Sequence, residues 1–388
     1  MPRTNEANRI DALDGLRGVA IMAVVIFHVC QVPELNSWLI SFNSIFSFGH
    51  FGSEFFLALS GFFMTRSLMK VRLHNYTVTS IIVRRYIRIA PLYYLALIVY
   101  ALFVPWSTSL FTDKARPIPE LYVILLYIFG LTNISVAING YLTYFDVTWT
   151  LNVQDQFYLF WIPAFIRMPL RWQKPVCWLI IIMSQIFRSV AVEYYSENTI
   201  HVLTPFRMDA LAIGCLFAIM NSEGLIHHSR FIIPITLLSS VLFIGTIAIF
   251  PCQGSEWFPR LGYSALGVLS MLWLWTGLTV DPSSLLGRML CTPWLRWYGQ
   301  RSYAVYLFHF FVYNALLAIS WFIRHKVFHM QANIYHTYIQ NILMGILTIP
   351  ACIPVAWILW KSVEGPLNRI RDRVHKPINM EPAASPSP

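Results

Sequence analysis

The segment at residues 14–28 reads DGLRGVAIMAVVIFH, an apolar run with an arginine near its start and a histidine at its end. At about 100° and 1.5 Å per residue, Arg17 and His28 share one helix face and lie about 16 Å apart along the axis. An ionisable side chain in a membrane span is costly and marks a functional site. His28 is therefore a candidate general base, and the alternative is a histidine that packs by hydrogen-bonding another helix.

Apolar runs of this kind fill the chain. Of its 388 residues, 57% are hydrophobic and only 12% are charged, whereas soluble domains are about a quarter charged. This composition excludes disordered, coiled-coil and collagen-like chains, and it argues strongly against an ordinary cytosolic enzyme. At roughly 20 apolar residues per span, it predicts an all-α polytopic membrane protein with about ten transmembrane helices.

The net charge is +10, from 28 Lys and Arg against 18 Asp and Glu. The basic residues lie between apolar runs, so we interpret them as topology signals in a lipid bilayer and expect no nucleic-acid partner. Both termini are then cytoplasmic. The expected crossings are about 17–35, 51–69, 89–106, 147–166, 175–193, 203–220, 231–251, 261–279, 299–322 and 338–360.

Residues 121–138 form an eleventh apolar segment. The loop at 107–120 is expected outside the membrane and the basic residues after 166 inside, so an odd number of crossings must connect them. Two apolar segments lie between these points, 121–138 and 147–166, so one of them does not cross. The second half of 121–138 is polar for a lipid-facing helix. We expect this segment to be re-entrant or non-crossing, covered by protein or by a water-filled cavity.

The domain organisation is simple. We expect one integral membrane domain over residues 1–376 and a disordered Pro- and Ser-rich tail over 377–388. The six cysteines are scattered without a CxxC pair, so neither a metal site nor a disulfide framework is expected. No cleavable signal peptide is evident.

Three further polar features accompany the apolar runs at 51–69 and 89–106. Ser60 precedes Gly61 in a pair that permits close helix approach, and a nucleophilic role for Ser60 is the weaker alternative. Glu54 is a possible acidic partner. Arg85 and Arg88 are three positions apart, on one helix face, and two guanidiniums there can hold phosphate groups. A basic lipid-headgroup cluster is the alternative for this pair.

The segment 149–158 reads WTLNVQDQFY and includes Trp149, Gln154 and Asp155. Its four polar side chains within five positions predict a polar site at the start of an apolar run.

Two more pairs lie within later spans. Arg207 and Asp209 are two apart, so they do not face each other and need separate partners. Arg301 and His309 are eight apart and need not act together.

In this order, these motifs resemble those of integral membrane acyltransferase family 3 over roughly residues 9–370. The segments that carry the resemblance are 13–18 with His28, 55–62, 85–93, 149–158, 207–210, 302–309 and 364–366. The resemblance implies an O-acyltransferase, most simply an O-acetyltransferase, in the bacterial inner membrane. It would move an acyl group from cytoplasmic acyl-CoA to a hydroxyl of a glycan or lipid-linked saccharide on the far side.

The resemblance also implies residue roles. His28 matches the catalytic histidine, and Arg17 is its partner in the motif that includes Asp14. Arg85 and Arg88 match the donor-binding pair. Acetyl-CoA would be a substrate, and no permanently bound cofactor is expected.

One position departs from the family pattern, because Gln154 stands where a glutamate is usual. Gln154 then keeps only a hydrogen-bonding role, or Asp155 compensates, or activity is reduced. Some family members carry an extracytoplasmic esterase-like domain, and this sequence is too short to hold one. Two alternatives stay open: a secondary transporter with a His and Arg proton relay, and a catalytically degenerate acyltransferase-like protein.

Overall fold

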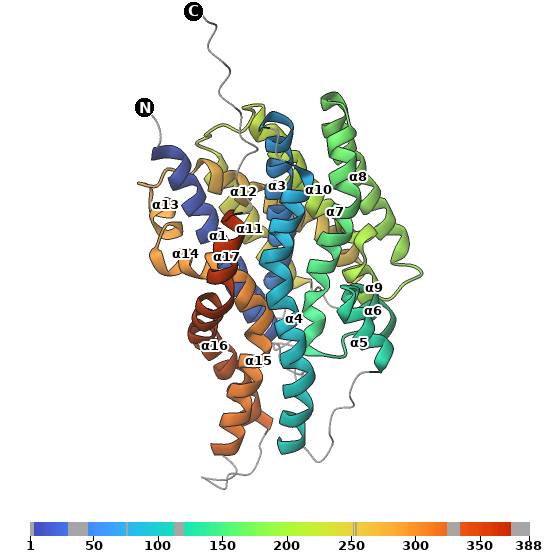
Figure 1. Cartoon of the computed structure of the whole chain (residues 1–388), viewed down its shortest axis with the longest axis vertical. Coiled ribbons are helices and arrows are strands. Elements are labelled where there is room, and N and C mark those ends of the chain that lie inside the picture. Colours follow the sequence, from blue (N-terminus) through green and yellow to red (C-terminus); the bar gives the residue numbers. More distant parts are fainter. Residues whose placement is uncertain are drawn as a thin grey trace, which may run out of the picture.

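The computed structural model describes residues 4–29, 46–74, 77–111, 120–250, 252, 254–323 and 334–373, which form helices and no strand. The helices run up and down along one long axis (Figure 1). The long helices are α1 (Thr4–Val29), α3 (His50–His74), α4 (Val78–Phe111), α7 (Trp149–Arg167), α8 (Leu170–Ala191), α10 (Thr204–Ser222), α11 (Ile232–Ile249), α12 (Tyr263–Thr279), α15 (Ser302–Phe322) and α16 (Ile334–Leu359). The short elements are η1 (Ser47–Gly49), α5 (Leu121–Ile128), α6 (Thr132–Asn139), η2 (Tyr144–Thr148), α9 (Glu197–Val202), η3 (Phe258–Gly262), α13 (Leu285–Leu290), α14 (Pro293–Gln300), η5 (Trp360–Glu364) and α17 (Gly365–Arg373).

Seven helical stretches of the described chain are long and apolar enough to cross a membrane. They are Asp11–Val29, Leu170–Ala191, Glu197–Ser222, Ile232–Ile249, Phe258–Thr279, Ser302–Phe322 and Ile342–Ile370. The other three expected crossings correspond to α3, α4 and α7, which have 25, 34 and 19 residues but are not among the seven. A total of ten crossings therefore stays a prediction.

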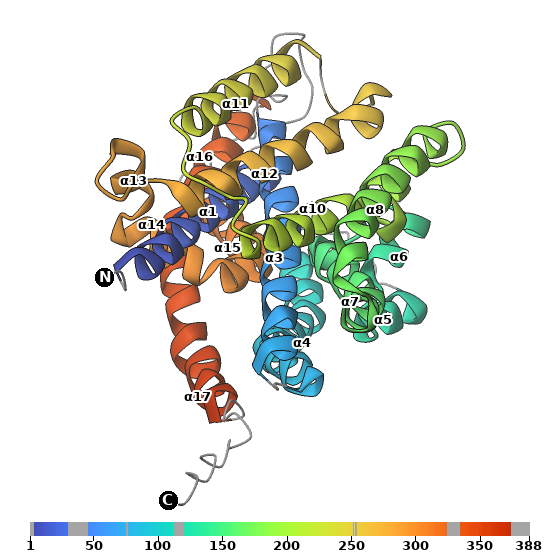
Figure 2. The same cartoon turned by 90° about the horizontal axis from the view of Figure 1, so that it is seen from above.

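The helices differ in how deeply they are buried. Of the 18 most apolar consecutive residues in the stretch Glu197–Ser222, which includes α10, 72% are buried, against only 22% in α8. Viewed from above, α1 and α3 lie in the middle of the bundle, while α8 and α11 lie on its outside (Figure 2). Polar residues on α1, α3 and α10 are therefore held inside protein.

Two of the expected segments have different boundaries in the structure. α1 begins at Thr4 rather than near residue 17, because Ala12 and Leu13 are already buried against protein. α4 begins at Val78 rather than near residue 89. The arginines at 84, 85 and 88 thus lie within α4 and can point into the bundle. The predicted tail at 377–388 lies outside the described residues.

The 121–138 segment folds as two helices of eight residues each, α5 and α6. Each is about 12 Å long, too short to cross a hydrocarbon core of about 30 Å. Gly130 allows the bend between them at φ +67°. The polar half of the segment faces α7: the Thr132 amide donates to Asn152 Oδ1 at 2.7 Å, and the amides of Asn133 and Gln156 pair at 3.0 Å. Protein, not lipid, covers these polar groups.

A buried carboxylate orders the connection from α6 to α7. Asp146 in η2 accepts hydrogen bonds from the Leu142 and Thr143 amides at 2.7 and 2.6 Å and from the Tyr127 hydroxyl at 2.7 Å. Burial raises the pKa of the Asp146 carboxyl, and these donors offset part of that shift. The loop that starts α7 is thereby fixed in place.

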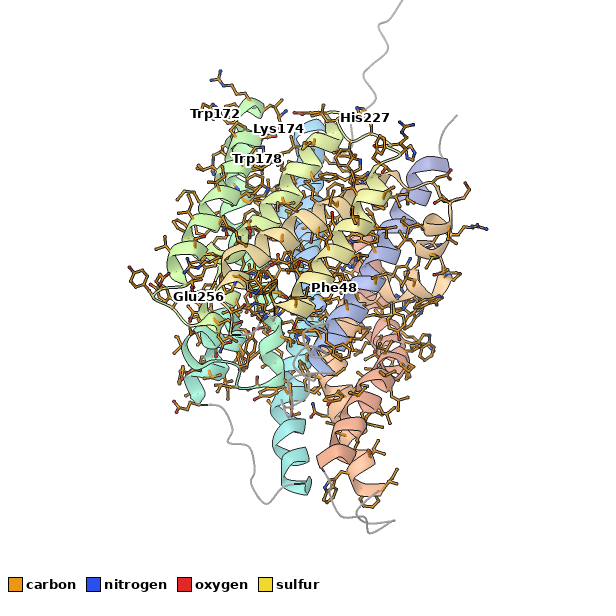
Figure 3. The ribbon with its side chains drawn as sticks, turned by 180° about the vertical axis from the view of Figure 1, so that it is seen from behind. Phe48, Trp172, Lys174, Trp178, His227 and Glu256 are labelled. Atoms are coloured by element: carbon orange, nitrogen blue, oxygen red, sulfur yellow. The ribbon has the colours of Figure 1, made fainter. Side chains whose placement is uncertain are left out.

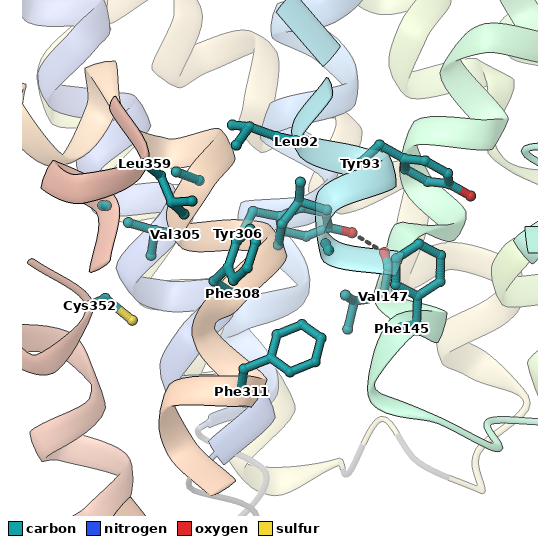
Figure 4. Close-up of a cluster of buried hydrophobic side chains, with 14 of the residues drawn as sticks. Leu92, Tyr93, Phe145, Val147, Val305, Tyr306, Phe308, Phe311, Cys352 and Leu359 are labelled. Carbon is teal, nitrogen blue, oxygen red and sulfur yellow. Dashed lines mark hydrogen bonds between the residues drawn. The ribbon is translucent and has the colours of Figure 1, made fainter. Parts of the chain in front are cut away.

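One apolar core lies between α4, η2, α15 and α16. Phe145, Val147, Val305 and Phe308 are among its buried members. Figure 4 shows Tyr306 reaching from α15 into this core, with its hydroxyl donating to the Val147 carbonyl.

Helix backbones touch where glycines replace side chains. A Cβ on Gly61 of α3 would lie 2.0 Å from the Leu211 carbonyl oxygen, and one on Gly214 of α10 would lie 1.8 Å from that of Ala58. A Cβ on Gly15 of α1 would similarly lie 1.9 Å from the Leu290 carbonyl oxygen. Close packing is thus one structural reason for glycine in the 13–18 motif.

The end of α3, the start of α4, the end of α7 and the start of α8 lie at one end of the bundle (Figure 1). These segments are rich in Lys and Arg. Lys174 and His227 lie at the same end, together with the half-exposed Trp172 (Figure 3). A basic end with exposed tryptophan is typical of a membrane–water interface.

Candidate functional site

A cavity of about 630 Å³ opens among α1, α3, α4, α7 and α15. This volume is within the usual range for small-molecule sites. Five basic side chains line it: Arg17, Lys70, Arg84, Arg85 and Arg88. The cavity therefore suits an anionic ligand.

Arg17 is held at the cavity wall by two contacts. Its guanidinium forms an ion pair with Asp14 at 3.4 Å and donates to the Ser302 hydroxyl at 3.2 Å. The other oxygen of Asp14 accepts from Gln300 at 3.1 Å. The ion pair of Arg17 and Asp14 is thus part of a network that joins α1 to α14 and α15.

Arg85 connects α4 to α7 at the cavity. Its Nε and Nη2 atoms donate to Asp155 Oδ1 at 3.2 and 3.1 Å, and Nη2 also donates to Gln154 Oε1 at 3.2 Å. The Ser60 hydroxyl donates to the same Gln154 oxygen at 2.8 Å. The Tyr158 ring lies 4.3 Å from the guanidinium carbon. In this structure Gln154 has a hydrogen-bonding role and Asp155 supplies the negative charge.

His28 lies beyond the cavity and pairs with His309. His28 Nδ1 is 3.2 Å from His309 Nε2, and the planes of the two rings differ by only 16°. His309 Nδ1 is 2.7 Å from the Tyr306 carbonyl oxygen. Tyr306 also lines the cavity, and its hydroxyl is 2.8 Å from that of Thr150. Tyr306 therefore lies between the cavity and the histidine pair.

The predicted common face of Arg17 and His28 is present. Arg17 contacts Ser302 and His28 contacts His309, and both partners belong to α15. Both candidate residues of α1 thus contact the same helix, α15.

A second polar cluster surrounds Arg207 in α10. Arg207 forms a buried ion pair with Glu54 of α3 and lies 3.8 Å from the centre of the Tyr263 ring. The Trp149 ring is 5.4 Å away. His201 is in contact with Tyr263, and its ring lies 4.6 Å from the Trp149 ring at a tilt of 58°.

Asp209 instead pairs with Arg188 of α8 at 2.7 Å. Arg207 and Asp209 thus have separate partners, as their spacing predicts.

Arg301 takes no part in these groups. Its guanidinium lies between the Trp297 and Trp360 rings, at 4.6 and 4.8 Å from their centres. The candidate residues therefore fall into a basic cavity, a histidine pair and an Arg207 cluster, with Arg301 apart.

Several residues at these places were not predicted from the sequence. Ser302 and Tyr306 line the cavity, while His50 and His201 lie in edge-to-face contact beside the Arg207 cluster. In the sequence, the same feature could have identified each of these residues: a polar group within or beside an apolar run.

Comparisons with known proteins identify a family and several relatives. A family model described as an acyltransferase domain matches residues 10–361. The peptidoglycan O-acetyltransferase OatA of Listeria monocytogenes is 25% identical over 389 residues, covering 95% of this chain and 58% of the relative. The putative peptidoglycan O-acetyltransferase YrhL of Bacillus subtilis is 26% identical, covering 79% of this chain and 49% of the relative. This chain spans about half the length of the curated relatives it matches. No solved structure matches it.

Proposed function

The chain belongs to the acyltransferase family whose model covers residues 10–361, and from this premise we propose that it is a membrane O-acetyltransferase. It takes an acetyl group from cytoplasmic acetyl-CoA and transfers it to a hydroxyl of a glycan on the far side of the membrane.

The observation that carries this proposal is the basic cavity. CoA carries phosphate groups at one end and a long, neutral arm at the other. Arg85 and Arg88 lie at the cavity wall, where they can hold phosphates. The fork of Arg85 is fixed by Asp155 and Gln154, so little ordering is needed when the donor binds.

In this proposal His28 carries out the proton transfers of the reaction. Arg17 orients the donor, and the extended arm covers the distance of about 16 Å along α1 from Arg17 to His28, so that the thioester lies at His28. The acceptor hydroxyl gives its proton to His28 as its oxygen attacks the thioester carbonyl. The new ester bond forms, the C–S bond breaks, and the proton passes from His28 to the departing CoA thiolate.

The relatives and the charge pattern support the proposed acceptor and location. Two relatives are named as a peptidoglycan O-acetyltransferase and a putative peptidoglycan O-acetyltransferase, and we propose peptidoglycan or a related lipid-linked glycan as acceptor. The gathering of basic helix ends at one end of the bundle supports cytoplasmic termini in a bacterial inner membrane.

Two measurements test the proposal. Purified protein in detergent should bind acetyl-CoA by calorimetry, whereas a transporter without a CoA site should not. Deletion of the gene should remove acetyl signals from the proton NMR spectrum of the cell-wall glycan. Wild type should restore them and His28→Ala should not, with equal protein levels in the membrane. Restoration by His28→Ala would refute the role of His28.

A further inference from the structure

We propose that His309 is a positioning residue that holds His28 as the tautomer protonated on Nδ1, which leaves Nε2 of His28 as the base. This inference rests on the proposed acetyl transfer, since it assigns the proton-accepting atom of that reaction. In this proposal His309 affects the reaction only by holding His28 and does not contact the substrate.

The first step concerns His309 itself. Its Nδ1 lies 2.7 Å from the Tyr306 carbonyl oxygen. A carbonyl oxygen can only accept, so Nδ1 of His309 bears the hydrogen. The acceptor is a backbone carbonyl of the same helix, so its position does not depend on any side-chain rotation. This carbonyl fixes the tautomer of His309.

The second step concerns the charge of the pair. His309 is completely buried. The ion pairs of the described residues place no carboxylate on either imidazole. A charged ring without a counter-ion is costly in an apolar interior. His309 is therefore neutral, and its Nε2 has a lone pair.

The third step transfers this assignment to His28. Its Nδ1 lies 3.2 Å from the Nε2 lone pair of His309 and must donate. The hydrogen bond made by one ring nitrogen sets the protonation of the other. His28 is partly exposed, whereas His309 is buried, so only His28 can meet a substrate.

The test compares His309→Leu with His309→Gln. Leucine removes the acceptor, and the Gln side-chain oxygen can restore it. We expect His309→Leu to lower kcat by about 100-fold or more, as loss of a positioned base does, with KM for acetyl-CoA within about threefold. His309→Gln should recover at least tenfold of the lost kcat. Full activity of His309→Leu, or equal loss in both variants, would overturn the inference.

A control and a second measurement separate this inference from the proposed function. His227→Leu, at an exposed loop position, should leave kcat unchanged. All variants should have the same melting temperature as the wild type. The ¹⁵N NMR spectrum of histidine-labelled resting protein needs no turnover. The signals missing in His28→Ala should show a protonated Nδ1 and a bare Nε2 in wild type. The opposite tautomer would refute the inference even in an active enzyme, and the expected tautomer would support it even in an inactive one.

Discussion

The Arg207 guanidinium and the Glu54 carboxylate form an ion pair in which the side chains are only 0% and 1% exposed. The pair connects α10 to α3 in the middle of the bundle, and the Tyr263 ring covers the guanidinium. Both charges have left water, so each depends on the other for compensation. Neither partner can be neutralised alone without a large cost.

Replacing Glu54 by glutamine should therefore destabilise the protein. The neutral amide leaves Arg207 buried without a counter-ion, which costs about 3–5 kcal/mol. Thermal unfolding in detergent, followed by circular dichroism, measures the change. The matched control is Glu193→Gln, because Glu193 pairs with Arg260 but is 58% exposed. That change should cost at most about 1 kcal/mol. Equal melting temperatures for the two variants would contradict this account.

Arg88→Gln should weaken donor binding. Loss of one charge-assisted hydrogen bond to phosphate costs about 1.5–3 kcal/mol, or roughly tenfold or more in affinity. Titration with acetyl-CoA gives the affinity directly. Arg171→Gln is the control, since Arg171 is exposed and does not line the cavity. Unchanged affinity in Arg88→Gln would place the phosphates elsewhere.

Gln154→Glu should lower donor affinity rather than restore activity. Arg85 is already neutralised by Asp155, so a second carboxylate adds a net negative charge to the cavity. Repulsion of the anionic donor by about 1 kcal/mol corresponds to roughly fivefold weaker binding. KM for acetyl-CoA and its salt dependence report this effect. A gain in kcat would instead identify Gln154 as a lost catalytic carboxylate.

Gly15→Ala should destabilise the contact between α1 and α13. The added methyl would lie 1.9 Å from the Leu290 carbonyl oxygen, and overpacking of this kind costs about 1–3 kcal/mol. Gly245→Ala in α11 offers a matched control, because nothing lies within 4 Å of its Cβ position. Alanine there should stabilise the helix by up to about 1 kcal/mol. Opposite shifts in melting temperature are the expected result.

Most long helices were predictable from hydropathy. The expected span at 203–220, for example, corresponds to α10 at Thr204–Ser222. The sequence also predicted that Arg17 and His28 share one helix face and that Arg85 and Arg88 share another, because helix periodicity fixes which residues share a face. α7 is harder, since its Asn152 and Gln154 point into protein. Hydropathy treats every span as if lipid surrounded it, and such a helix scores as polar.

The arrangement between helices could not be predicted. Gln154 and Asp155 point about 100° apart on a helix, yet both reach Arg85 because a guanidinium presents several donors. His28 and His309 meet across 281 residues of sequence. Spacing within one helix contains no information on which helix will lie beside it.

The reciprocal glycine contacts at Gly61 and Gly214 have a mechanical consequence. Two backbones that touch at both points leave no room for either helix to slide or rotate past the other. α3 and α10 must therefore move as one rigid body. Any rearrangement of the bundle then has to occur between this body and its neighbours, for example between α3 and α7, which the Ser60–Gln154 hydrogen bond connects.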